Sequence, residues 1–82
     1  MDTQERIQTA IQALEQSFDD FLAETGFSDH VIVRLGWYNT AVEIVNEAPD
    51  QDPDFQEAVV MYLNSKIVEY RVGLIRQWLG SI

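Results

Sequence analysis

The chain has 82 residues, no cysteine and a formal net charge of −9 at pH 7. This length suits one domain with a single modest core, and at this size stability often depends on oligomerisation. The lack of cysteine excludes a disulfide framework, a thiolate metal site and a thiol nucleophile. The acidic charge disfavours direct contact with nucleic acid or anionic membranes and favours a basic protein partner, although it also serves solubility alone.

The charge is unevenly distributed along the chain. Residues 1–30 and residues 43–57 are each strongly acidic, whereas residues 58–82 carry three bases, Lys66, Arg71 and Arg76, against one acid, Glu69. The first residues lack the basic start and apolar run of a signal peptide, and no apolar segment reaches membrane-spanning length. We therefore expect a cytoplasmic protein.

The sequence pattern over residues 3–25 predicts the first helix. Asp2 and Glu5 resemble a capping box, and one apolar arc follows at helical spacing. The arc contains Ile7, Ala10, Ile11, Leu14, Phe18, Phe21 and Leu22. Polar residues fill the rest of the circumference, as is typical of an outer helix with one covered face. Gly26 is the expected stop, with Phe27 folding back on Leu22.

The second predicted helix runs over residues 29–47, with Ser28 as its cap. Its first residues, Val31 to Val33, also have strand propensity, but the seven-residue recurrence of Val31, Tyr38 and Val45 favours a helix. The connection from the first helix is very short, which predicts antiparallel neighbours. Two prolines in residues 48–53 end the second helix and form the linker to the third.

Residues 53–79 predict a third, long helix, with Asp52 as its cap and Pro53 at its first position. Two sides of it are apolar. One side contains Phe55, Val59, Tyr62, Leu63, Ile67, Tyr70 and Leu74, and the other contains Met61, Val68, Val72, Ile75 and Leu79. A helix with two apolar sides must be covered on both. The alternative is a break at Gly73, after which the last segment folds back.

Together these elements predict an all-α fold, an up-down-up three-helix bundle within a single domain spanning residues 1–82. The first helix offers one narrow apolar stripe and the second a broader one, and together they cover one side of the third. We therefore expect a homodimer or higher symmetric oligomer built on its second side. The expected self-association residues are Met61, Val68, Arg71, Val72, Ile75, Trp78 and Leu79. Arg71 either lays its stem on the core or sets the register against an acid such as Glu57.

A second candidate surface is acidic. We expect a partner-binding set of Glu15, Asp19, Asp20, Glu24, Asp50, Asp52 and Asp54, with the acids of the first helix on a solvated face. The spacing of Asp50, Asp52 and Asp54 resembles the start of a calcium loop. Phe55 and Met61 stand where that loop needs glycine and a bidentate glutamate, so helix capping is favoured.

No residue pattern indicates catalysis. His30 is the only histidine, without a second ligand or a positioned nucleophile, and is interpreted as a surface residue. We expect no enzyme activity, no metal and no cofactor. The leading hypothesis is a homo-oligomeric interaction module, an adaptor, regulator or assembly subunit. The alternatives are an acidic inhibitor that covers a basic nucleic-acid-binding surface, as phage counter-defence proteins do, and a small-ligand site between subunits.

Overall fold

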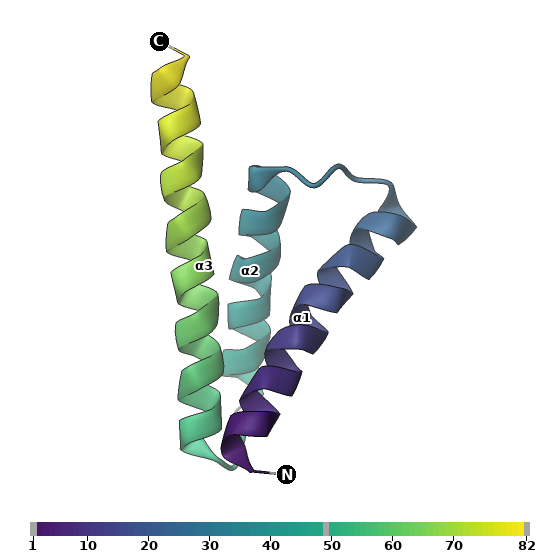
Figure 1. Cartoon of the computed structure of the whole chain (residues 1–82), viewed down its shortest axis with the longest axis vertical. Coiled ribbons are helices and arrows are strands. Elements are labelled where there is room, and N and C mark those ends of the chain that lie inside the picture. Colours follow the sequence, from purple (N-terminus) through teal and green to yellow (C-terminus); the bar gives the residue numbers. More distant parts are fainter. Residues whose placement is uncertain (1, 49, 82) are drawn as a thin grey trace.

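The computed structural model describes residues 2–48 and 50–81, and its secondary structure there consists of three helices and no strands. These are α1 (Thr3–Thr25), α2 (Val31–Glu47) and α3 (Pro53–Gly80). Figure 1 shows α2 running opposite to the other two, with the N-terminal ends of α1 and α3 close together. The all-α prediction is confirmed. Pro49 of the predicted linker lies outside the described residues.

Helix α1 begins and ends where the sequence predicts. The Asp2 carboxylate accepts a hydrogen bond from the backbone N–H of Glu5 at 2.8 Å, which satisfies one of the free donors at the helix start. At the other end Gly26 adopts φ 74°, and its N–H donates to the carbonyl of Leu22 at 2.9 Å. Glycine takes this left-handed conformation without the clash that a Cβ brings, so the helix stops here.

Helix α2 starts two residues later than predicted, because His30 and not Ser28 caps it. The Nδ1 atom of His30 accepts a hydrogen bond from the backbone N–H of Ile32 at 3.1 Å. Residues 26–30 are therefore a non-helical connection, and the prediction of a very short turn is wrong. Figure 1 shows the consequence: α1 leans away from α2 at this end of the molecule. The choice of helix over strand for this segment is confirmed.

Helix α3 continues through Gly73 without a break, so the alternative in which its end folds back is excluded. Asp52 caps it, accepting hydrogen bonds from the N–H groups of Asp54 and Phe55, and Pro53 occupies the first position as predicted. At 1.5 Å per residue the helix is about 42 Å long. Its C-terminal end extends well past the start of α2 (Figure 1).

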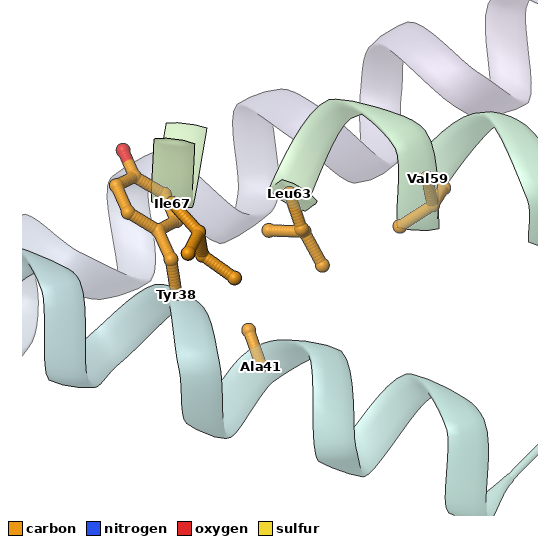
Figure 2. Packing of buried hydrophobic residues seen from close by; sticks show 5 residues of the cluster. All are labelled: Tyr38, Ala41, Val59, Leu63 and Ile67. Atoms are coloured by element: carbon orange, nitrogen blue, oxygen red, sulfur yellow. The ribbon is translucent and has the colours of Figure 1, made fainter. Parts of the chain in front are cut away.

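The core lies mainly between α2 and α3. Tyr38 and Ala41 of α2 pack against Val59, Leu63 and Ile67 of α3, the five residues drawn in Figure 2. Helix α1 adds one fully buried side chain, Phe18. Because α1 and α2 both lie against the same side of α3, the opposite side of that helix receives no cover from the described chain.

Candidate interaction surfaces

Five apolar side chains on the bare side of α3 form what we call the outer stripe: Met61, Val68, Val72, Ile75 and Leu79. All five are exposed in the single chain, from 42% for Val72 to 63% for Met61. Trp78, at the edge of the outer stripe, is 65% exposed. An aromatic ring so open to water is a favoured anchor at protein interfaces.

Arg71 lies beside the outer stripe and is exposed. Of its two predicted roles, laying the stem on the core does not fit this position. Among the described residues Arg71 makes no ion pair, and Glu57, its expected registry partner, is likewise exposed on α3. The guanidinium of Arg71 is therefore accessible to a partner.

A second apolar surface is the groove where α1 leans away from α2. Near the connection it is a hollow of about 440 Å³, lined by Phe21, Phe27, Ile32, Val33, Gly36, Trp37 and Thr40. The ring of Trp37 packs against Phe18 and Phe21, at centroid distances of 5.5 and 5.3 Å. The Trp37 Nε1 atom is buried without a hydrogen-bond acceptor in the described part of the chain. Sequence reasoning did not identify this groove.

Glu15 lies between the helices, so the expectation of a solvated position on α1 is wrong. Its carboxylate accepts hydrogen bonds from the hydroxyls of Tyr38 and Tyr62, each at 2.7 Å. The acid thus joins α1 to α2 and to α3. Burial, and then the adjacent carboxylate, raise the pKa of both tyrosines, because ionised rings there would lose hydration and repel Glu15.

Arg34 of α2 completes this polar cluster. Its Nη1 atom lies 3.6 Å from Glu15 and donates to the Tyr38 hydroxyl at 3.3 Å, while its Nε and Nη2 atoms bind both oxygens of Asp29. The Asp29 hydrogen bond is the main reason that the pKa of Arg34 is raised, and Arg34 in turn lowers the pKa of Asp29. The guanidinium also lies 4.4 Å above the ring of Phe18. Sequence reasoning missed Arg34, although it stands four residues before the core residue Tyr38.

Two of the linker acids are also engaged within the chain. Arg6 of α1 forms an ion pair with Asp50 at 2.9 Å and lies 3.7 Å from Asp52, which accepts a further hydrogen bond from Thr3. The pKa of Asp50 is lowered, first by a hydrogen bond from the backbone N–H of Asp52 and then by Arg6. Arg6 also lies 4.2 Å above the ring of Phe55. These contacts fasten the start of α1 to the start of α3.

The remaining predicted acids are open to solvent. Asp19, Asp20 and Glu24 on α1 and Asp54 on α3 are exposed, and Asp20 accepts only a hydrogen bond from Gln16 within the helix. The structure therefore divides the predicted set: three acids hold the fold together, and four are available to a partner.

Neither a metal-ligand cluster nor a membrane-spanning helix occurs within residues 2–48 and 50–81. In the described ranges, no three histidine, aspartate or glutamate side chains gather so as to hold a metal ion. His30 serves as a helix cap. None of the three helices, as far as the structure describes them, combines the length and apolar character needed to cross a bilayer.

Comparison of the chain with protein-family models, with curated proteins and with solved structures found no match.

Proposed function

We propose that the protein is a non-enzymatic interaction module that self-associates through the outer stripe of α3 and serves as an adaptor, regulator or assembly subunit. The observation that carries the proposal is the exposure of the whole outer stripe in the single chain. Scattered apolar residues on a surface need no explanation, but exposed apolar residues that gather on one side of a helix, as they do from Val68 to Leu79, often mark an interface.

The arrangement of the helices supports the proposal, because the described chain offers no element to cover the outer stripe. Helices α1 and α2 both pack against the side of α3 that contains Val59, Leu63 and Ile67. The continuity of α3 through Gly73 removes the remaining internal source of cover. A second copy offers the same stripe, and two identical apolar surfaces related by a twofold axis bury one another.

Light scattering of the unmodified chain over a range of concentrations tests the proposal, with a dimer expected. The variant Val68→Glu/Ile75→Glu places two charges in the outer stripe and should be monomeric, because each dimer would bury four uncompensated carboxylates. Gln8→Glu/Gln12→Glu, at exposed positions of α1, is the matched control and should remain dimeric. An unmodified chain that stays monomeric at high concentration would contradict the proposal.

A second candidate function, the acidic inhibitor, is supported by the exposure of Asp19, Asp20 and Glu24 along α1. Fewer acids are available for this function than the sequence predicts, because Glu15, Asp50 and Asp52 make contacts within the chain. The dependence of binding on salt concentration distinguishes the two candidate functions. Binding through exposed acids should weaken steeply as salt rises, whereas association through an apolar stripe should not.

A further inference from the structure

We infer that the second copy lies antiparallel on α3, with Val72 opposite Ile75 of the second copy and Val68 opposite its Leu79. This inference rests on the proposed self-association and adds the orientation and the register. It follows from the spacing of the outer stripe and from the charges on either side of it.

The spacing is that of a coiled coil. The residues Met61, Ser65, Val68, Val72, Ile75 and Leu79 follow one another at intervals of four, three, four, three and four. Alternating steps of three and four keep one seam facing a partner helix along its length. Ser65 is the one polar member of the seam, which places the continuous apolar part at Val68 to Leu79.

The positions that flank a coiled-coil seam select orientation and partner. On one side of the outer stripe these positions hold Glu69 and Arg76, and on the other side they hold Arg71 and Trp78. All four side chains are exposed. Glu69 lies 3.4 Å from Lys66 within α3, through its Oε2 atom. A surface contact of this kind contributes little to stability, so Glu69 can exchange it for a partner across a twofold axis.

A parallel arrangement brings like charges together. In a parallel pair, a residue on one flank of the stripe meets the residue on the other flank that lies five positions later in the second copy. Arg71 of each copy therefore lies beside Arg76 of the other. It also sets the acidic N-terminal parts of the two copies side by side. Both effects oppose this orientation.

In an antiparallel arrangement, residues on the same flank of the two copies meet each other. With Val72 opposite Ile75 of the second copy, Glu69 of each copy meets Arg76 of the other, which forms two interchain ion pairs. On the opposite flank Arg71 lies beside Trp78 of the second copy, an arrangement suited to a cation–aromatic contact. This register gives both exposed arginines and the exposed tryptophan a partner.

The neighbouring antiparallel registers lack this complementarity. A shift of one heptad towards the bundle places Met61 opposite Leu79 of the second copy, but it sets Glu69 against Glu69, Arg71 against Arg71 and Ser65 against an isoleucine. A shift the other way sets Arg76 against Arg76. The pairing of Arg71 with Glu57 expected from sequence needs a much larger shift, which leaves Ile75 and Leu79 without opposite residues.

The shape of the molecule accommodates the inferred register. The overlap from Val68 to Leu79 is about 18 Å long at 1.5 Å per residue and lies in the C-terminal half of α3, whose end extends past the start of α2 (Figure 1). The α1 and α2 helices of the two copies then stand at opposite ends of the dimer. Their acidic surfaces are separated, and neither obstructs the other copy.

Cross-linking tests the orientation cleanly, because the chain has no cysteine of its own. We expect Val68→Cys and Leu79→Cys proteins to form a disulfide-linked dimer only when mixed. In the inferred register the two copies of residue 79 are about 16 Å apart along the axis, too far for a disulfide. A parallel pair would instead link each variant to itself, which would overturn the inference while leaving self-association intact.

A second mixture tests the register. Met61→Cys mixed with Leu79→Cys should stay unlinked, because in the inferred register these two residues are about 10 Å apart along the axis, too far for a disulfide. Linkage in this mixture together with none between Val68→Cys and Leu79→Cys would overturn the register. A monomeric unmodified chain would overturn the proposed function as well.

Charge variants provide an independent test, because one substitution changes the affinity of the dimer in opposite directions for the two orientations. Arg76→Glu should weaken the antiparallel dimer about tenfold, because it replaces two attractive pairs with two repulsive ones, whereas it would strengthen a parallel dimer. Glu69→Arg should weaken the dimer similarly. The two variants mixed should associate with each other at the unmodified strength, and failure of that rescue would count against the inferred register.

Discussion

Leu63 and Met61 stand two residues apart on α3, yet Leu63 is fully buried and Met61 is 63% exposed. They represent the two apolar sides of one helix. The inner side is covered by α2 and α1, and the hydroxyl of Tyr62 ties it to Glu15 of α1. The outer side is flanked only by exposed side chains. Apolar side chains of the same kinds are therefore packed within the chain on one side of α3 and exposed on the other.

The largest expected effect separates the two sides directly. Leu63→Ala should reduce the free energy of unfolding by about 2–5 kcal/mol, since it removes buried methyl groups and leaves a cavity. Met61→Ala should change it by less than about 0.5 kcal/mol, because the side chain is already in water. Urea denaturation at low protein concentration measures both. Equal losses would mean that the outer side is covered within the single chain.

Removing the tyrosine hydrogen bonds that join the helices on the covered side of α3 should give the next largest loss of stability. Tyr38→Phe and Tyr62→Phe each remove a hydrogen bond to the Glu15 carboxylate, and each should cost about 1–2 kcal/mol of unfolding free energy. Tyr70→Phe is the matched control, because its hydroxyl makes no hydrogen bond among the described residues and its ring packs on Tyr38. The same denaturation series compares all three, and a comparable loss in the control would sink the hydrogen-bond explanation.

The inner side should also respond to alkaline pH. The pKa values of Tyr38 and Tyr62 are raised in the fold above the ordinary value of 10.0. Their contribution to stability is therefore complete below pH 10 and is lost as the pH rises above it, since the unfolded chain releases these protons first. Melting temperatures measured from pH 8 to pH 11 should fall, and they should fall less in Tyr62→Phe. An equal fall in both proteins would assign the loss to other groups.

The smallest expected effect on stability concerns the acids that lie on neither side of α3. Reversing Asp19, Asp20 and Glu24 to lysine should leave the helical circular dichroism and, within about 0.5 kcal/mol per site, the stability unchanged, because all three are exposed. Loss of binding to a basic partner in this variant would support the inhibitor function. Unchanged affinity would leave solubility as the explanation of these acids.

Much of this architecture follows from periodicity. The apolar spacing predicts three helices, the caps at Asp2 and Asp52 fix two helix starts, and the second apolar side of α3 is evident from the order of its residues alone. These features are local, and helix geometry converts them directly into positions in space.

The features that sequence reasoning missed depend on more than one helix. The polar neighbours of Glu15 in sequence predict a solvated acid, although Glu15 follows Ile11 by four residues and precedes Phe18 by three. Only the arrangement of α2 and α3 shows that two tyrosines converge on it. The late start of α2 and the groove beside Trp37 likewise depend on the connection at residues 26–30, whose path no periodicity describes.

The attachment of α1 changes along its length. The ion pairs of Arg6 with Asp50 and Asp52 fasten its first turns, and Glu15 and Phe18 hold its middle against the other two helices. Phe21 still packs on Trp37, but residues 23–25 of the last turn are exposed. The backbone amides of that turn should therefore exchange hydrogen with solvent faster than those around Phe18.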